Sequence, residues 1–450
     1  MRDYAFVLFL FAFFGLGFRK PFLFVLVYAY IDIVSPQRLT YLLLNSLPIS
    51  LIAVALAVAG WLAVDDKRDV RVAPRQFLIV ILLGYCFYTT KHADFPLEAL
   101  DKWDWVWKAL AFAAFLPLTL RSKLRIEALL LFMVLSASSI IIVGGIKTIL
   151  SGGGYGELNL MVANNSGLYE GSTISMVAIA IIPLILWFTR YGTIFPPDWK
   201  VKTFAYALVF ACLLIPIGTS TRTGLLCIVL LAVLMLRDTS KKLVYLGALG
   251  AVALVAVPFL PSAFTERMGT IKTYQADASA STRLAVWQWT MDYAKSHPLG
   301  GGFEAYRQNQ IRYEKVAVES DGGGNAKVDR SLEVDKARAY HSAYFEMLGE
   351  QGYPGLAIWL LINLAGIFRM EVLRRRYAKP EPGQEWIAPL ASALQSGHLI
   401  YMLGGTFIAI AFQPFIYMLI GAQIGLDTYC ARKRAETSWR PLRKPRMAAA

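Results

Sequence analysis

The sequence has few of the residues that build disulfide frameworks or metal sites. Only 4 cysteines and 4 histidines occur among its 450 residues. His398 lies within an apolar run, where we expect a packed, hydrogen-bonded side chain. The cysteines also lie in or beside apolar runs, and their spacing suits neither a disulfide framework nor a metal site. We interpret them as small apolar side chains in packed helices; they are Cys86, Cys212, Cys227 and Cys430.

Charged residues are also scarce, at 17% against the roughly 25% of an average soluble domain. The hydrophobic content is 56% and the mean hydropathy is +0.49, which argues against a chain of soluble domains. Repeated apolar runs predict a polytopic membrane protein instead. The first run, "YAFVLFLFAFFGLGF", resembles a signal-peptide core but lacks an Ala-x-Ala cleavage site, so we expect it to be retained.

The net charge of +14 raises the question of a nucleic-acid partner. The longest polar segment, 261–340, holds 11 Lys and Arg against 10 Asp and Glu, so it is nearly neutral. The remaining positive charge lies mainly in short loops and the C-terminal tail. This distribution follows the positive-inside rule of membrane proteins and does not indicate nucleic-acid binding.

Long apolar segments set the fold class. A membrane-spanning helix needs about 20 predominantly apolar residues. Arg19, Lys20 and Pro21 divide the first two segments, which form either a tight hairpin or one broken span. We therefore predict an all-α, polytopic integral membrane protein with about 12 transmembrane helices. The segments are 4–18, 21–35, 41–64, 76–90, 103–120, 127–149, 171–189, 203–218, 224–236, 243–260, 353–368, 387–411 and 413–428.

Basic residues recur at every second loop, as the positive-inside rule requires of an alternating topology. We assign these basic loops, and the strongly basic tail from Arg432, to the cytoplasm. The remaining loops, including the loop 150–170 that lacks lysine and arginine, then face outward, which in a bacterium is the periplasm. The basic clusters lie at 67–75, 121–125, 190–202, 237–242 and 374–376.

This topology divides the chain into four parts. Within the outer segment, "STRLAVWQWTMDYAKSHP" predicts a helix that Ser281 or Thr282 caps and that ends before Pro298. The following "GGGFEAYRQNQIRYEKV" predicts a glycine-rich turn and a polar helical piece, and "ESDGGGNAKVD" a flexible stretch. The four parts are an N-terminal transmembrane bundle (1–260), a periplasmic helical segment (261–340), C-terminal transmembrane helices (341–428) and a basic cytoplasmic tail (429–450).

Arg222 is the first candidate for a functional side chain. It lies in "IPIGTSTRTGLLCIVLL", where a very short turn joins two apolar spans, so its charge stays near the membrane plane. A charge there is costly unless it reaches the interface or meets an anion. An arginine on the outer side runs against the positive-inside rule, and the hydroxyl residues at 219, 220, 221 and 223 can donate to phosphate oxygens. Anion binding and interfacial anchoring both remain as interpretations.

Arg283 and His341 are the other two candidates. Arg283 lies in the first turn of the predicted outer helix, where a guanidinium beside free N–H groups suits phosphate; a solvated surface arginine is the alternative. His341 opens the helix that re-enters the membrane in "ARAYHSAYFEMLGEQGYPGL". Its imidazole is either a general base near neutral pH or an interfacial polar group. Glu346 and Glu350 follow on the same helix. Each of them is expected to orient a ring or to line a groove.

Topology places Arg222, Arg283 and His341 on one side of the membrane at one depth. Two cations and a base there suit a lipid whose pyrophosphate lies at headgroup level, so we hypothesise that the site binds a polyprenyl diphosphate and transfers what it carries. The arginines would hold the diphosphate as leaving group, and His341 would take a proton from an acceptor hydroxyl. No Asp-x-Asp motif or His/Cys ligand set is evident outside, so neither a metal nor a cofactor is expected.

At these residues the chain resembles the O-antigen ligase and polymerase superfamily, in particular the WaaL-type O-antigen ligases. The order, spacing and many-span layout are similar over most of the chain. Near Arg222 the family's Ser-Arg-Gly pattern is met only in part, because Thr223 separates the arginine from Gly224. The opening, "MRDYAFVLFLFAFFGLGFRKPF", is similar to O-glycosylation ligases of exosortase-associated systems in the same superfamily. The four matching stretches are "TSTRTG", "TRLAVWQW", "HPLGGGFEAY" and "HSAYFEMLGEQGYPGL".

The resemblance implies a glycosyltransferase of the GT-C type in the bacterial inner membrane, with its active site facing the periplasm. Such an enzyme moves O-antigen from undecaprenyl diphosphate to a sugar hydroxyl of lipid A–core, with inversion and without a metal. By analogy, Arg222 and Arg283 bind the diphosphate and His341 is catalytic. The expected partners are the lipid-linked glycan donor, the lipid A–core acceptor and membrane lipid.

Other functions remain open. An O-antigen polymerase or a protein O-oligosaccharyltransferase of the same superfamily shares these motifs. A transporter of lipid-linked glycans is the alternative from another class. Transporters usually show internal repeats and ionisable residues at mid-membrane, whereas this sequence shows no evident repeat and its polar candidates cluster at one face.

Overall fold

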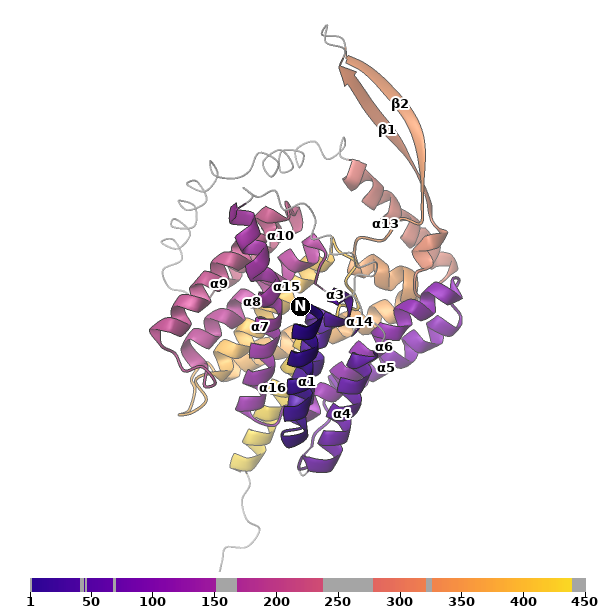
Figure 1. Ribbon diagram of the computed structural model, residues 1–450. Helices are drawn as coiled ribbons and strands as arrows, with labels where there is room; N and C mark the ends of the chain where they lie inside the picture. The colour runs from indigo at the N-terminus through magenta and orange to yellow at the C-terminus, as the bar shows by residue number, and fades with distance from the viewer. Residues whose placement is uncertain are drawn as a thin grey trace, which may run out of the picture.

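The computed structural model describes residues 2–40, 44, 47–67, 70–150, 168–237, 278–320 and 326–438. In this part of the chain a helical bundle carries one projecting β-hairpin (Figure 1). The helices are α1 (Arg2–Arg19), α2 (Phe22–Val34), α3 (Pro36–Leu39), α4 (Ile49–Val64), α5 (Pro74–Lys91), α6 (Pro96–Thr119), α7 (Lys123–Leu150), α8 (Gly171–Tyr191), α9 (Trp199–Gly218), α10 (Arg222–Leu236), α13 (Ala278–Ser296), α14 (Ala343–Arg376), α15 (Ile387–Gly405) and α16 (Pro414–Ser438).

The apolar runs of the sequence correspond to these helices. Each predicted segment overlaps one of them, except 243–260, which lies outside the described residues. Among the described helices, four are long and apolar enough to cross a membrane, namely α7, α8, α9 and α14. The apolar helices α2, α4 and α10 are shorter. The helical fold suited to a membrane is therefore confirmed, and the number of about 12 spans stays a prediction.

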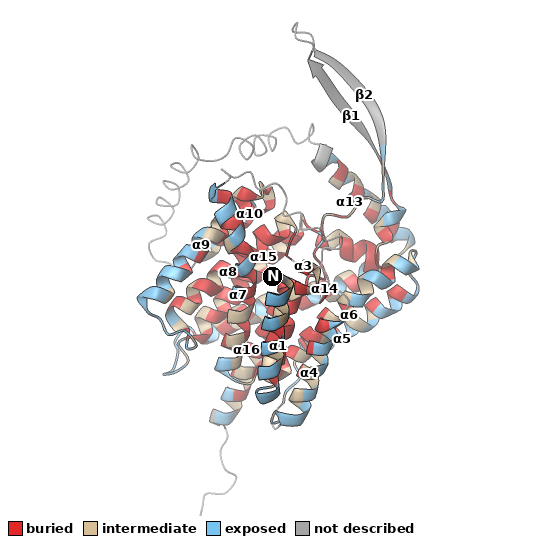
Figure 2. Ribbon diagram, viewed as in Figure 1, coloured by how far each residue is buried: buried red, intermediate tan, exposed pale blue. Residues whose placement is uncertain are grey.

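The outer faces of the bundle carry large apolar side chains that a water-soluble protein would bury. Five of them are between 49% and 66% exposed: Phe87, Phe204, Phe210, Val229 and Phe368. Figure 2 shows buried residues between the helices and exposed residues along their outer faces. Because the apolar surface extends over several helices, it indicates that lipid surrounds the bundle.

The helices pack as one bundle. α8 contacts α7, α9, α10 and α15, and α14 contacts α5, α13, α15 and α16. One apolar core contains residues from α2 through α16. The N-terminal and C-terminal membrane parts predicted from the sequence therefore share a core.

The basic loops meet at one end of the bundle. Arg125 Nη2 lies 2.7 Å from Asp65 Oδ1, which joins the first turn of α7 to the α4–α5 loop. Lys123 Nζ donates to Tyr191 O (3.3 Å) at the end of α8, and it lies 5.4 Å from the ring centroid of Trp386 before α15. The alternation of basic loops along the sequence thus corresponds to a grouping in space, which is the arrangement that the positive-inside rule describes.

The outer segment departs from the all-helical prediction. After α13 the chain forms a short 3₁₀ turn (Ala305–Gln308) and then β1 (Gln310–Ser320) and β2 (Ala326–Lys336). The two strands are antiparallel, with Gln310 opposite Lys336. The predicted polar helix after the glycine-rich turn is therefore wrong. The β-branched residues of "QIRYEKVAVES" favour a strand, and pairing with β2 outweighs the helix propensity of its charged residues.

Two smaller expectations on this segment have different outcomes. α13 ends at Ser296, before Pro298, as predicted. It begins at Ala278, however, so Ser281 and Thr282 lie within the helix and do not cap it. The stretch "ESDGGGNAKVD" lies partly in β1 and β2, and its residues 321–325 are outside the described residues.

α14 has a kink at Gly352, whose φ of 62° and ψ of −168° lie in a region that glycine adopts readily. A Cβ at this position would lie 2.3 Å from Pro298 O and 2.4 Å from Gly300 N. The next residue, Tyr353, donates its N–H to Pro298 O (3.0 Å). The kink therefore seats the turn that follows α13 directly on α14.

Gly352→Ala is expected to lower stability by about 3 kcal/mol, because a backbone at φ 62° and ψ −168° costs a residue other than glycine roughly 1–3 kcal/mol and the Cβ overlaps two backbone atoms. Gly383→Ala is the matched control, since Gly383 has a φ of 85° and no described atom lies within 4 Å of the place its Cβ would take. Thermal unfolding of both variants in detergent measures the difference. An equal loss of stability in the two variants would show that the close approach of the turn to α14 contributes nothing to stability.

Candidate active site

Arg222 begins α10, directly after the turn from α9. Two hydroxyl groups of this turn bond within the protein. Thr219 Oγ1 donates to Ile215 O (2.8 Å), and Thr221 Oγ1 donates to Ser175 Oγ on α8 (2.9 Å). Contrary to expectation, these two hydroxyl protons are directed into the protein and hold the turn against α8. The guanidinium of Arg222 lies at the start of α10, where backbone N–H groups carry partial positive charge. It is therefore a better candidate for binding an anion than these two hydroxyl groups.

Glu170 precedes α8 beside this turn. Its carboxylate accepts hydrogen bonds from Ser172 N (2.9 Å) and Thr173 N (2.6 Å) and so caps the helix. A Cβ at the neighbouring Gly171 would lie 3.4 Å from Thr219 Cβ. The starts of α8 and α10 therefore adjoin, and they bring Glu170 close to the turn that carries the first candidate arginine.

Arg283 lies in the second turn of α13, because the helix starts at Ala278. The adjacent Thr282 is buried, and its hydroxyl accepts a long hydrogen bond from Arg338 Nη2 (3.4 Å). The backbone of Arg338 is fixed by Asn309, whose Nδ2 donates to Arg338 O (2.7 Å) and whose Oδ1 accepts from Arg338 N (2.9 Å). A second guanidinium group is thus held at the start of α13.

His341 lies just before α14 and does not open it as predicted. Ser342 is the N-cap residue, and the helix starts at Ala343. The φ of His341 is 48°, in the left-handed region that costs a non-glycine residue roughly 1–3 kcal/mol. Residues held in such conformations cluster at functional sites, where the surrounding structure fixes them.

Three charged groups act on the partly buried imidazole of His341. Burial is the main cause that lowers its pKa below the ordinary 6.5, and the positive charges of Arg283 and Arg338 lower the pKa further. The negative charge of Glu170 acts in the opposite sense. Because such effects weaken with distance, Arg283, Arg338 and Glu170 lie in the neighbourhood of this imidazole. The start of α8, which follows Glu170, also adjoins the turn that precedes Arg222.

Sequence analysis did not single out Arg338 and Glu170. Arg338 stands three residues before His341 in "ARAYHS", and Glu170 precedes two hydroxyl residues in "YEGST", a pattern typical of a helix start. Both patterns are visible in the sequence. Neither of them indicates that the two side chains lie near one imidazole, because the segments are far apart along the chain.

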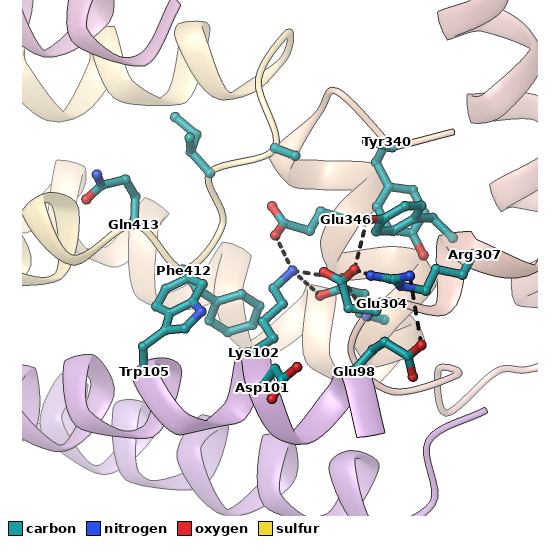
Figure 3. Close-up of a pocket in the computed structure, with 15 residues that line it drawn as sticks. Glu98, Asp101, Lys102, Trp105, Glu304, Arg307, Tyr340, Glu346, Phe412 and Gln413 are labelled. Atoms are coloured by element: carbon teal, nitrogen blue, oxygen red, sulfur yellow. Dashed lines mark hydrogen bonds and ion pairs between the residues drawn. The ribbon is translucent and has the colours of Figure 1, made fainter. Parts of the chain in front are cut away.

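A cavity of about 240 Å³ lies beside the segment that carries His341 (Figure 3). Ala339 and Tyr340 belong to its wall, and His341 is not among the described residues that line it. The rest of the lining comes from α6, the 3₁₀ turn, α14 and the segment before α16: Glu98, Asp101, Lys102, Trp105, Glu304, Tyr306, Arg307, Glu346, Glu350, Ala409, Ile410, Phe412 and Gln413.

Lys102 binds both carboxylates of α14 that face the cavity. Its Nζ lies 2.7 Å from Glu346 Oε1 and 2.8 Å from Glu350 Oε1, and Figure 3 shows Lys102 beside Glu346. Glu350 Oε1 also accepts from Glu304 N (3.1 Å), and Glu346 Oε2 accepts from Ala411 N (2.9 Å). Of the two roles expected for these glutamates, lining a groove is therefore the one that the structure supports.

Lys102→Ala is expected to lower stability by about 3–5 kcal/mol, because it leaves two carboxylates buried without their counter-ion. The side chains of Glu346 and Glu350 are only 6% and 0% exposed. Lys295→Ala is the control, since Lys295 and its partner Asp292 are 70% and 55% exposed and such pairs contribute about 0–1 kcal/mol. Thermal unfolding measures both variants; a Lys102 variant as stable as the control would contradict the assigned buried pairing.

The expectations for His398 and the cysteines are confirmed. His398 is fully buried, with Nε2 2.8 Å from Asn363 Oδ1 and Nδ1 3.1 Å from Gln423 Nε2. It is a packed, hydrogen-bonded histidine within the bundle. All four cysteines are buried thiols, as expected of small apolar side chains.

Comparison with known proteins adds two matches. Residues 207–360 match the family model described as O-antigen ligase, and residues 1–193 match a family of unknown function (DUF5935). No curated protein matches the chain. The O-antigen ligase match includes Arg222, Arg283 and His341, and it also includes Arg338 and the β-hairpin.

Proposed function

We propose that this protein, which carries an O-antigen ligase family domain at residues 207–360, transfers a glycan from a polyprenyl diphosphate to a hydroxyl group. The observation that carries the proposal is the position of His341 in that domain: it is held in a left-handed conformation directly before α14, where Arg283 and Arg338 act on its imidazole. The specific reaction proposed is that of WaaL-type ligases. O-antigen would move from undecaprenyl diphosphate to a sugar hydroxyl of lipid A–core.

In the proposed reaction the acceptor oxygen attacks the anomeric carbon of the glycan. The new C–O bond forms as the bond from that carbon to the diphosphate oxygen breaks, and attack from the opposite side inverts the centre. His341 takes the proton of the hydroxyl, since its lowered pKa keeps the imidazole neutral and able to accept it. Arg222 and Arg283 hold the diphosphate and stabilise the charge of undecaprenyl diphosphate as it leaves. These steps use neither a metal nor a cofactor.

In this proposal the protein lies in the bacterial inner membrane. It has a GT-C type architecture of about 12 spans, and its active site faces the periplasm. Arg222 and His341 stand at the starts of α10 and α14. The other ends of these helices carry Arg237 and Arg374, which belong to basic clusters. By the positive-inside rule, that charge distribution supports a cytoplasmic position for those ends and a periplasmic one for the site.

An acceptor assay tests the proposal. Purified full-length protein is incubated with undecaprenyl diphosphate-linked glycan and, in turn, lipid A–core, a second copy of the donor, or a polypeptide. Covalent transfer to lipid A–core is the expected result. Transfer only to the donor would indicate a polymerase, and transfer only to polypeptide a protein O-oligosaccharyltransferase. Movement of donor across proteoliposomes without any covalent product would indicate a transporter and contradict the proposal.

Transfer is expected to depend on pH through His341. Burial, Arg283 and Arg338 lower its pKa, so kcat/KM should fall only below pH 6.5, as the imidazole becomes protonated. Arg283→Gln removes one of the cations and should move this fall to higher pH. Profiles of kcat/KM for both proteins measure the shift, and Lys295→Gln on an exposed part of α13 is the control. An unchanged midpoint in Arg283→Gln would contradict the proposed proximity.

A further inference from the structure

A second cavity, of about 620 Å³, lies at the far ends of the helices that begin at the candidate site. The last turns of α8, α10 and α14 line it, together with α9 and the beginning of α15. Tyr191 belongs to the lining, and its carbonyl oxygen accepts from Lys123 Nζ (3.3 Å), so the cavity lies where the basic loops meet. Its volume is in the range of roughly 300–1,000 Å³ that is typical of pockets for small molecules.

Aromatic side chains indicate the membrane depth of this cavity. Trp187, Tyr206 and Tyr377 line it together with Tyr191. Tyrosine and tryptophan are enriched where the hydrocarbon of a membrane meets water. Tyr206 and another lining residue, Met235, are 59% and 51% exposed on the outer faces of α9 and α10. The cavity therefore lies at headgroup level and borders the surface that faces lipid.

The lining carries an excess of positive charge. Arg190 and Arg374 line the cavity, and Glu385 is the one carboxylate among its described lining residues. Arg190 is exposed, and within the described chain no carboxylate pairs with it. Arg374 shares its carboxylate partner, Glu371, with Arg237. An anion that enters the cavity is therefore attracted to this group of guanidinium side chains.

Two serines on one face of α15 offer hydrogen bonds to such an anion. Ser392 and Ser396 both line the cavity, one helical turn apart. Ser392 Oγ accepts from Arg237 Nη2 (2.9 Å), and within the described chain its own proton has no acceptor. Ser396 is 7% exposed, and its hydroxyl has no hydrogen-bond partner among the described residues. A buried hydroxyl without a partner is unfavourable, and an oxygen of a ligand in the cavity would satisfy it.

We infer that this cavity binds an anionic phospholipid of the leaflet at this end, which is the cytoplasmic leaflet in the proposed orientation. The lipid phosphate would bond to Arg190 and Ser392, and an ester carbonyl would accept from Ser396. The acyl chains would follow Leu186 and Leu234, which also line the cavity, toward the surface that faces lipid. Basic pockets between membrane helices on the cytoplasmic side suit anionic headgroups. The inference does not depend on glycan transfer, because it uses only the lining of this cavity.

Native mass spectrometry of the purified full-length protein in an uncharged detergent tests the inference. The probes are phosphatidylglycerol and phosphatidylcholine with the same acyl chains, and glycerol 3-phosphate is the soluble competitor. We expect phosphatidylglycerol to bind at least about tenfold more tightly than phosphatidylcholine, because only the former has a net negative charge. Arg190→Gln should weaken the binding of phosphatidylglycerol about fivefold and leave that of phosphatidylcholine almost unchanged. Ser396→Ala should weaken both lipids about fivefold, since both carry ester carbonyls.

Lys202→Gln is the matched control, because Lys202 is an exposed basic residue at the same end of the bundle and is not among the described lining residues. It removes the same charge and should leave lipid binding unchanged. Thermal unfolding in lipid-free detergent shows that each variant is folded. Equal binding of the two lipids, or an effect of Arg190→Gln no larger than that of Lys202→Gln, would indicate ordinary surface lipid and overturn the inference. Displacement of phosphatidylglycerol by an equal concentration of glycerol 3-phosphate would assign the cavity to a soluble anion and overturn it as well.

Discussion

Replacing His341 with alanine is expected to lower the rate of glycan transfer by about 10²–10⁴-fold, the usual contribution of a general base. Donor affinity should change little, because the guanidinium groups of Arg222 and Arg283, which we propose to hold the diphosphate, remain. The left-handed backbone of His341, with φ 48°, makes asparagine the better-matched replacement, since asparagine adopts this region more readily than alanine. His341→Ala and His341→Asn should lose activity alike, although the alanine variant should be the less stable.

Single-turnover transfer and donor binding, measured on the same preparations, separate the two roles of this residue. Thermal unfolding in detergent shows whether each variant is folded. Transfer at the normal rate by either folded variant would contradict the assignment of His341 as the base. A loss of donor affinity as large as the loss of rate would make His341 a binding residue instead.

Arg222→Ala and Arg283→Ala are each expected to weaken donor binding about 10–100-fold, because each removes a charge-assisted contact worth roughly 1.5–3 kcal/mol. Lysine should restore little of the loss at either position, since an ammonium group cannot form the two parallel hydrogen bonds of a guanidinium. Arg338→Ala should have a smaller effect, because Arg338 also pairs with Asp335 and bonds to Thr282.

Lys295→Ala is the matched control for these variants. It lies on α13 like Arg283, is 70% exposed and pairs with Asp292 (2.7 Å), so its loss removes a positive charge without touching the site. Binding is measured by titration with undecaprenyl diphosphate. Unchanged donor affinity in both Arg222→Ala and Arg283→Ala would contradict the proposal that these two arginines hold the diphosphate.

The helices were predictable because each is marked locally. Apolar runs fix their existence, and proline at the first turn marks the starts of α5 and α6 at Pro74 and Pro96. The β-hairpin was not predictable in this way. Its first strand contains charged residues that favour a helix, and the partner strand lies beyond the "DGGG" stretch. Only the pairing of Gln310 with Lys336 and of the residues between them decides the structure.

Only part of the candidate site could be predicted from the chemistry of single residues and from the predicted topology. A histidine and two arginines at the outer interface suggested a diphosphate-binding transferase before their neighbours were known. Lys102 gives no such signal, because its partner Glu346 is 244 residues further along the chain. Arg338 and Glu170 likewise become relevant only when α8, α13 and the start of α14 are brought together.

The most direct test of the central claim is donor protection of single cysteines at positions 222, 283 and 341. The native cysteines are all buried, so their background labelling by a membrane-impermeant maleimide should be low. Our account predicts labelling of all three positions from the periplasmic side and slower labelling at each when undecaprenyl diphosphate is bound. Labelling of any of them from the cytoplasmic side, or labelling that undecaprenyl diphosphate leaves unchanged at all three, would contradict it.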